Sequence, residues 1–112
     1  MMISVFGVYS FKNNAMDAKT SMASFYHSKF NGRKTASGEI FSNMKFTAAN
    51  MKLPFGTKVK ITNLRNGESV VVRVNDRGPF HASRAFDLSQ AAYDEIGDLK
   101  KGVMPIEYEI LD

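Results

Sequence analysis

The sequence of 112 residues contains no cysteine. This absence excludes disulfide scaffolds, cysteine-ligated zinc, iron–sulfur centres and thiol nucleophiles, and it gives no support to a lipid anchor on a cysteine. Only two histidines are present, which argues against a histidine-rich metal site. No apolar run is long enough to cross a bilayer, so we expect no membrane span. Any chemistry of this chain therefore falls to its ordinary polar side chains.

The composition is that of one small globular domain, with 44% hydrophobic and 23% charged residues. Fifteen Lys and Arg against eleven Asp and Glu give a net charge of +4. Residues 29–65 hold eight basic residues and one acid, whereas residues 87–112 hold seven acids and two lysines. This asymmetry favours either two solvated surfaces of opposite sign or a basic rim around a site for an anionic ligand.

Residues 1–22 differ in character from the rest of the chain. Residues 1–9 are apolar except Ser4, and residues 12–21 are polar. No basic residue precedes the apolar stretch, yet the pattern is typical of the end of a secretory signal. We therefore interpret residues 1–22 as a leader remnant that packs poorly against a domain of residues 23–112. An ordinary N-terminal strand is the alternative interpretation.

Alternating apolar and polar residues predict several strands. Residues 57–64 and 69–75 alternate on either side of Asn66-Gly67, a pair that tolerates positive φ and predicts a hairpin. Residues 105–111 alternate as a last strand. We expect five or six short strands with mostly antiparallel neighbours, closed into a small barrel.

One helix is marked by its ends. Ser89 is a typical N-cap for a helix that continues to about Ile96 and ends at Gly97. Residues 47–51 predict a second short helix or a turn, and residues 23–30 alternate loosely enough for a strand. The fold class is therefore mainly β with one or two short helices.

Three acids in loops or at strand ends are candidates for chemistry. Asp76 follows a hydrophobic strand, so the sheet fixes its position. Asp87 lies between Phe86 and Leu88, and partial desolvation by apolar neighbours favours the protonated carboxyl that a general acid needs. Glu39 lies in a polar loop.

Each of these acids also has a structural interpretation. Asp76 begins the sequence Asp-Arg-Gly-Pro, which suits a turn. Asp87 could be the buried partner of Arg77 or Arg84, or could cap the helix that follows it. Glu39 could be a solvated loop acid. The residues alone leave both interpretations open.

A series of short segments in chain order carries a more specific signature. These segments are Ala23-Ser24-Phe25-Tyr26, Phe30 to Glu39, Thr47-Ala48-Ala49, Leu53-Pro54-Phe55-Gly56-Thr57, Asp76-Arg77-Gly78-Pro79-Phe80 and Asp87-Leu88-Ser89. Together they closely resemble the rare lipoprotein A family from about Ala23 to the end of the chain. The resemblance implies a six-stranded double-psi β-barrel, shared with the N-terminal domain of expansins. It also implies a septal lytic transglycosylase that acts on glycan strands lacking stem peptides.

The resemblance places the chemistry on Asp76 and Asp87, which we expect to share one groove. One carboxyl protonates the glycosidic oxygen between N-acetylmuramic acid and N-acetylglucosamine. It then accepts the proton of the muramic C6 hydroxyl as the 1,6-anhydro ring closes. We expect the aspartate with the raised pKa to be this acid, and the reaction requires neither a cofactor nor a metal.

The resemblance also suggests substrate-binding residues. They are Glu39, Asn50 and Thr47 as hydrogen-bonding groups at the rim, Arg77 as an orienting charge, and Tyr26 as an aromatic surface for a sugar. Asn50 stands where the family has histidine, and an amide cannot titrate. The alternative function is therefore a non-catalytic glycan-binding or expansin-like wall-loosening module.

The resemblance further implies where the protein acts and what it meets. We expect an exported monomer, periplasmic or associated with the outer membrane, whose partners are peptidoglycan glycan strands and cell-division proteins. A purely structural partner of division proteins is a further interpretation. Nucleic acid suits the basic residues 29–65, but the three acids of the expected groove oppose it.

Overall fold

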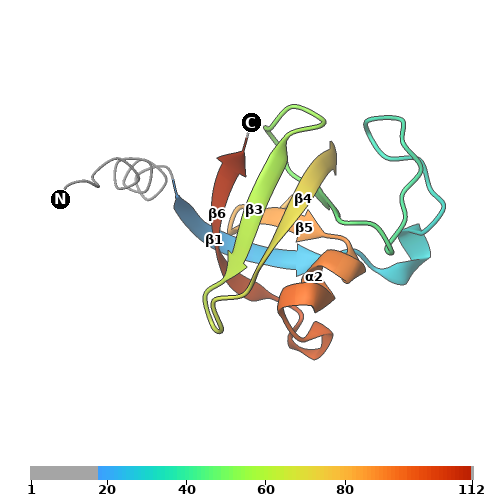
Figure 1. Ribbon diagram of the computed structural model, residues 1–112. Helices are drawn as coiled ribbons and strands as arrows, with labels where there is room; N and C mark the ends of the chain where they lie inside the picture. The colour runs from blue at the N-terminus through green and yellow to red at the C-terminus, as the bar shows by residue number, and fades with distance from the viewer. Residues whose placement is uncertain (1–17, 112) are drawn as a thin grey trace.

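The computed structural model describes residues 18–111 of the chain. Its elements are β1 (Lys19–Phe25), η1 (Ser28–Phe30), β2 (Thr47–Ala49), β3 (Lys58–Asn63), β4 (Ser69–Asp76), β5 (Arg84–Leu88), α2 (Gln90–Ile96), η2 (Leu99–Lys101) and β6 (Met104–Leu111). The six strands close into a barrel in the order β1-β5-β2-β4-β3-β6 (Figure 1). The predicted mainly β fold, a closed barrel with short helices, is confirmed.

Strand β2 has a special place in this barrel. It pairs in parallel with β4 and antiparallel with β5, while β1 pairs in parallel with β5. The other three neighbouring pairs are antiparallel, as expected. Strand β2 lies between β4 and β5 in the barrel. The end of β4 and the end of β5 are therefore separated by the width of this one strand.

The β3–β4 hairpin forms where its alternation predicts it. Val59 pairs with Val72 and Ile61 with Val70, and all four side chains are buried in the barrel. The turn differs in one detail from the expectation. Of the pair Asn66-Gly67 only the glycine has positive φ, at 78°. The turn therefore requires the left-handed backbone conformation at Gly67 and not at Asn66.

The prediction of a helix or turn at residues 47–51 is wrong. Thr47, Ala48 and Ala49 form strand β2, and all three are buried. A strand that is covered on both faces does not alternate in polarity, so sequence periodicity cannot identify it. Pairing with β4 and β5 determines the conformation here.

The barrel begins earlier than the expected boundary at residue 23. Lys19 to Met22 belong to β1 and pair antiparallel with Tyr108 to Pro105 of β6. Poor packing is therefore wrong for these residues, because their backbone helps to close the barrel while the side chains of Lys19 and Thr20 stay exposed. The remainder of the leader interpretation, residues 1–17, lies outside the described residues.

Two hydrophobic clusters lie on opposite faces of the sheet. The larger fills the barrel, and the smaller joins Tyr26, Phe41 and Ala49, with Phe30 packed against it. Helix α2 begins at its predicted N-cap, Ser89, whose Oγ accepts from the N–H of Ala92 at 3.3 Å. The smaller cluster supports the loop between η1 and β2, seen at the side of the barrel in Figure 1.

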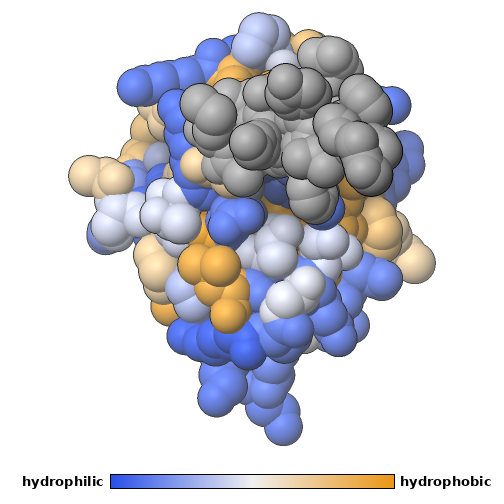
Figure 2. Space-filling model, turned by 60° about the vertical axis from the view of Figure 1, so that its left-hand side comes forward, coloured by the Kyte–Doolittle hydropathy of each residue, from blue (hydrophilic) through white to orange (hydrophobic). Residues whose placement is uncertain are grey.

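The surface offers no long apolar element. On the face shown in Figure 2, hydrophobic residues form separate patches among hydrophilic ones. Within residues 18–111, none of the helices has the length and apolar character that crossing a membrane requires.

Candidate functional site

A row of four residues crosses four adjacent strands at one level. Ser24 of β1 pairs with Asp87 of β5, Asp87 pairs with Ala49 of β2, and Ala49 pairs with Asp76 of β4. Paired residues project to the same face of a sheet, and neighbouring strands lie about 4.8 Å apart. The two aspartates therefore share one face, about 10 Å apart at their backbones, with only the small side chain of Ala49 between them.

The carboxylate of Asp76 is surrounded by hydrogen-bond donors. Oδ1 accepts from the N–H of Ala36 at 2.8 Å and from the N–H of Arg77 at 2.9 Å. Oδ2 accepts from the hydroxyl of Tyr26 at 2.5 Å. The bond to Arg77 is local, as the turn interpretation requires, but the other two reach residues 40 and 50 positions away. Three donors and no acceptor suit an ionised carboxylate.

Asp87 lies in a different environment on the same face. It is half-buried, and its Oδ1 accepts from the hydroxyl of Ser24 at 3.0 Å. Burial raises the pKa of this carboxyl above its ordinary value, and the charge of Asp76 raises it further. The Ser24 hydrogen bond and the charge of Arg84 oppose that rise. Desolvation is the largest of these effects, so Asp87 holds its proton to a higher pH than an ordinary aspartate does.

The two aspartates act on a common neighbour, Tyr26. Burial raises the pKa of this phenol, as do the hydrogen bond to Asp76 and the negative charge of both aspartates. Tyr26 therefore stays neutral and remains a donor to Asp76 at physiological pH. Its ring is buried, stacks on Phe41 at 4.1 Å and meets the edge of Phe30 at 5.9 Å, so its faces are covered by protein.

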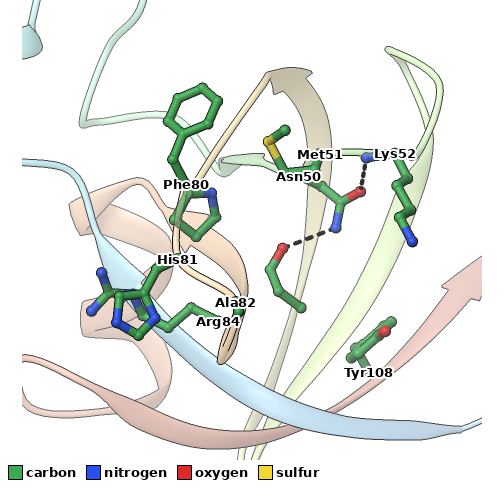
Figure 3. A pocket seen from close by; sticks show the side chains of 10 residues that line it. Asn50, Met51, Lys52, Phe80, His81, Ala82, Arg84 and Tyr108 are labelled. Atoms are coloured by element: carbon green, nitrogen blue, oxygen red, sulfur yellow. Dashed lines mark hydrogen bonds between the residues drawn. The ribbon is translucent and has the colours of Figure 1, made fainter.

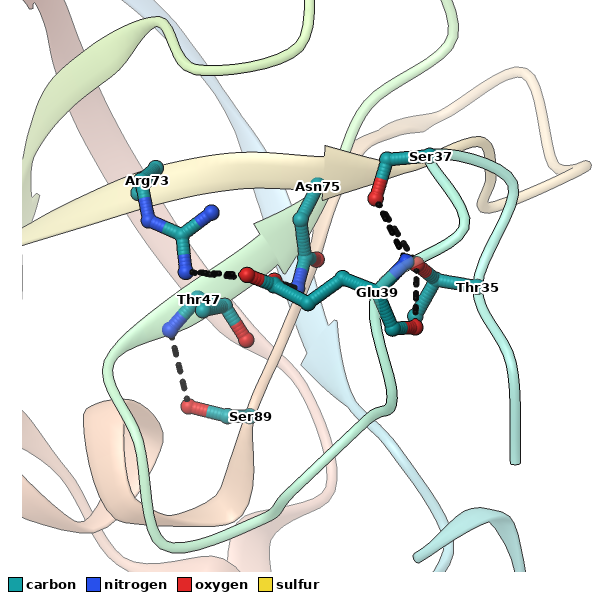
Figure 4. A network of polar contacts seen from close by, with 7 residues as sticks. All are labelled: Thr35, Ser37, Glu39, Thr47, Arg73, Asn75 and Ser89. Atoms are coloured by element: carbon teal, nitrogen blue, oxygen red, sulfur yellow. Dashed lines mark hydrogen bonds and ion pairs between the residues drawn. The ribbon is translucent and has the colours of Figure 1, made fainter. Parts of the chain in front are cut away.

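Glu39 is bound by side chains of strand β4 (Figure 4). Its carboxylate accepts from Nη2 of Arg73 at 2.9 and 3.1 Å and from Nδ2 of Asn75 at 2.5 Å. The Asn75 hydrogen bond, followed by that of Arg73, lowers the pKa of Glu39. Thr47 lies nearby, paired with Arg73, but it is only 3% exposed. Glu39 thus fastens the loop between η1 and β2 to the barrel, and Thr47 is buried rather than at a rim.

The side chain of Asn50 organises the loop that follows β2 (Figure 3). Its Oδ1 accepts from the N–H groups of Lys52 at 2.9 Å and Leu53 at 2.8 Å. Its Nδ2 donates to the carbonyl of Ala85 at 2.9 Å. These bonds connect the loop to the start of β5. They use both the oxygen and the nitrogen of the Asn50 amide.

Arg77 supports the same loop. Its Nη1 donates to the carbonyls of Asn50 at 3.2 Å and Leu53 at 2.9 Å, and its guanidinium lies 4.0 Å from the ring centre of Phe55. The side chain is therefore engaged with protein groups of this loop. Asp87 has no ion pair with Arg77 or Arg84 within the described part of the chain, and Ser89 rather than Asp87 caps α2.

A cavity of about 420 Å³ adjoins this region (Figure 3). Its walls come from the loop after β2, the loop before β5, Arg84 and Ala85 of β5, and Tyr108 of β6. The aspartates are not among its lining residues. Among residues 18–111, no group of three His, Cys, Asp or Glu side chains is arranged to hold a metal ion.

Sequence reasoning missed the residues that hold the acids. Ser24 is bonded to Asp87, while Arg73 and Asn75 are bonded to Glu39. The alternation of β4 indicates that Arg73 faces outward, but nothing local to the sequence pairs it with a loop 34 residues earlier. The register of β1 against β5 brings Ser24 to Asp87, and no spacing in the sequence encodes that register.

Comparison with known sequences gives a consistent result. The protein family described as "Lytic transglycolase" matches residues 18–108. A protein of Pasteurella multocida named endolytic peptidoglycan transglycosylase RlpA is 52% identical over 94 residues, covering 84% of this chain and 32% of that protein. A protein of Synechocystis named probable endolytic peptidoglycan transglycosylase RlpA is 53% identical over 93 residues, covering 83% and 29%. This chain spans about a third of the length of these curated relatives.

Solved structures agree on the fold. The Streptomyces papain inhibitor superposes with a TM-score of 0.70 at 22% identity, over 85% of this chain and 94% of that one. The Clavibacter michiganensis expansin superposes with a TM-score of 0.69 at 21% identity, over 85% and 50%. Since the family match extends over most of the barrel, the chain belongs to the lytic transglycolase family and has the RlpA-like double-psi β-barrel fold.

Proposed function

We propose that this barrel is the catalytic domain of a peptidoglycan lytic transglycosylase. It cleaves glycan strands between N-acetylmuramic acid and N-acetylglucosamine and leaves 1,6-anhydromuramic acid ends. The names of relatives about half identical to this chain support the reaction class. The observation that carries the proposal is the row with Asp76 and Asp87 on one face, where burial raises the pKa of Asp87 and three donors hold the carboxylate of Asp76.

Asp87 is the proposed acid and base. Its desolvated carboxyl gives its proton to the glycosidic oxygen as the bond from that oxygen to muramic C1 breaks. The Asp87 carboxylate then takes the proton of the muramic C6 hydroxyl, whose oxygen forms the new bond to C1. The proton returns to Asp87, no water is consumed, and a single carboxyl serves both halves of the reaction.

Asp76 is the proposed electrostatic partner. Its carboxylate is fixed by Tyr26 and by two backbone N–H groups, so it is held in place before substrate arrives. A fixed negative charge on the same face stabilises the positive charge that develops on the muramic ring as the glycosidic bond breaks. Glu39, Asn50 and Arg77 support this site by holding loops, and Thr47 is buried in strand β2 beside it.

The experiment that tests the proposal is product analysis. The 112-residue chain is incubated with peptide-free glycan strands, and the fragments are analysed by mass spectrometry. The expected products end in 1,6-anhydromuramic acid, and Asp87→Asn and Asp76→Asn abolish them. Asp94→Asn, an exposed aspartate of α2, is the matched control and keeps the activity. Retention of the protein on strands without any product supports the non-catalytic glycan-binding module instead.

The proposed substrate also sets the location. An enzyme of peptidoglycan acts in the compartment that holds the wall, so we propose an exported protein that is periplasmic or associated with the outer membrane. Glycan strands are its proposed partners, together with cell-division proteins that direct it to new wall. We propose that the barrel acts as a monomer.

A further inference from the structure

Arg84 is an arginine without a protein partner beside the proposed acid. It is half-buried at the start of β5, and its Nε is buried with no hydrogen-bond acceptor among the residues described. No carboxylate of residues 18–111 lies within ion-pair distance of it. Leaving a buried N–H group of a guanidinium without an acceptor costs stability, so a ligand that accepts a hydrogen bond from Arg84 would remove that cost.

The register of β1 and β5 places Arg84 on the face of the aspartates. Met22 pairs with Arg84 and Ser24 pairs with Asp87, and Met22 and Ser24, two apart on β1, project to the same side. Arg84 and Asp87 are three apart on β5, and the bulge where the register shifts between Met22 and Ala23 takes up the extra residue. The guanidinium accordingly acts on Asp87, lowering its pKa against the effect of burial. Arg84 also lines the neighbouring cavity, on the side away from Lys52 and Tyr108 (Figure 3), so a ligand that enters the cavity can reach it.

The other arginines near the site are already engaged. Arg73 is paired with Glu39, and Arg77 is bonded to two backbone carbonyls and lies over the ring of Phe55. Arg84 is therefore the arginine on this face that remains available to an anion. Two carboxyl groups on the same face repel an anionic ligand, which makes a compensating cation necessary if the ligand carries a carboxylate.

We propose that Arg84 binds the carboxylate of an acidic sugar, the lactyl carboxylate of the muramoyl residue next to the reacting bond. This inference rests on the proposed function, because that substrate carries such a group on the sugar whose glycosidic oxygen Asp87 protonates. The planar guanidinium forms two parallel hydrogen bonds to a carboxylate, which orients the sugar as well as attracting it. Arg84 is thus a substrate-recognition residue beside the acid.

The test compares two ligands that differ in one group. Peptide-free glycan strands are used as prepared, or after reduction of their carboxyl groups to hydroxyls, and the dissociation constant of the 112-residue chain is measured on each. Loss of one charge-assisted pair weakens binding about tenfold. We expect carboxyl reduction to weaken wild-type binding by that factor. Arg84→Gln should lose as much on native strands and nothing further on reduced strands.

A matched variant controls for net charge. Arg65 is an exposed arginine at the β3–β4 hairpin, bonded to the carbonyl of Val103. Arg65→Gln removes the same charge at the turn before β4, at the opposite end of that strand from Asp76, and should change binding to both kinds of glycan strand by about twofold or less. Arg84→Lys keeps the charge and the stem but loses the planar fork. We expect an intermediate loss on native strands alone, so the comparison stands even if Arg84→Gln fails to fold.

The outcomes separate this inference from the function on which it rests. Equal loss on native and reduced strands for the Arg84 variants overturns the inference and leaves the transglycosylase proposal intact. Persistence of the Arg84→Gln effect in an Asp87→Asn background supports direct recognition, whereas its disappearance there shows that Arg84 acts only through Asp87 and overturns it. Failure of the wild-type chain to bind either strand overturns both proposals.

Discussion

Tyr26 donates its phenolic hydrogen to Oδ2 of Asp76 at 2.5 Å, across 50 positions of the sequence. The bond joins the end of β1 to the end of β4, two strands that are not neighbours in the barrel. The phenol is buried and stays neutral, so Asp76 keeps this donor at physiological pH. The small hydrophobic cluster around Tyr26 thereby fixes the position of a carboxylate at the surface.

The first prediction concerns this hydrogen bond. Tyr26→Phe keeps the ring that stacks on Phe41 and removes only the hydroxyl. We expect the free energy of unfolding to fall by about 1 kcal/mol and product formation to fall about tenfold, because Asp76 loses its side-chain donor. Denaturation in urea and product analysis measure the two effects. Tyr108→Phe, in a half-buried tyrosine that packs on Phe86, is the control and should change neither quantity.

The second prediction concerns the free energy of unfolding, which the buried carboxyl of Asp87 lowers at neutral pH. Its pKa is raised in the folded state above the ordinary value of 3.8, so the folded protein binds this proton more tightly than the unfolded chain. Well below pH 3.8 both states are protonated and the residue has no effect. As pH rises above 3.8, the unfolded chain ionises first, and the native protein loses stability relative to a variant that cannot ionise.

Asp87→Asn should therefore be inactive yet more stable than the native protein at neutral pH. The gain should grow from pH 3.5 to pH 7, as measured by urea denaturation at fixed pH values. Asp94→Asn, in an exposed aspartate, should show no such growth. A stability difference that shrinks as pH rises would mean that the folded state favours the carboxylate of Asp87, and Asp87 would then be unsuited to act as the acid.

The strands that alternate could be predicted from the sequence, and the strand at the centre of the site could not. Residues 57–64, 69–75 and 105–111 each present one face to the core, so their periodicity is visible. Strand β2 is buried on both faces and shows none. Its place between β4 and β5 follows from tertiary pairing, which is the kind of information that a single sequence carries least.

The candidate acids could be named from the sequence, but their relationship could not. Asp76 and Asp87 stand out because each ends or lies within an apolar segment. Their position on one face depends on the register of both with Ala49, and on a bulge between Ala48 and Ala49 that shifts that register by one residue. A change of one residue in register would turn an aspartate to the other side of the sheet.

The third prediction concerns the loop between η1 and β2. Glu39→Gln removes the charge that pairs with Arg73, and the two side chains are 36% and 39% exposed. We expect a loss of about 1 kcal/mol at pH 7, because a half-exposed pair contributes modestly. The pKa of Glu39 is lowered by folding from its ordinary value of 4.5, so its contribution is present above that pH and is lost as pH falls.

Thermal denaturation of the Glu39→Gln variant at pH 7 and pH 3 measures this effect. The difference from the native protein should be present at pH 7 and smaller at pH 3. Faster amide hydrogen exchange in residues 31–46 should accompany it, since Glu39 fastens that loop to β4. Glu68→Gln, in an exposed glutamate of the β3–β4 hairpin, is the control and should leave stability and exchange unchanged.

The last prediction concerns Asn50, which stands where the family has a histidine. Its side-chain amide is bonded to Ala85, Lys52 and Leu53, so it holds a loop, and within residues 18–111 it is not hydrogen-bonded to the carboxyl group of either aspartate. Asn50→Ala should lower the free energy of unfolding by about 2 kcal/mol through the loss of these hydrogen bonds. Asn50→His can keep one acceptor and one donor, and should change product formation less than about tenfold, because Asp87 supplies the titrating group. An inactive native chain that gains activity with Asn50→His would instead identify the natural protein as a glycan-binding module that has lost its catalysis.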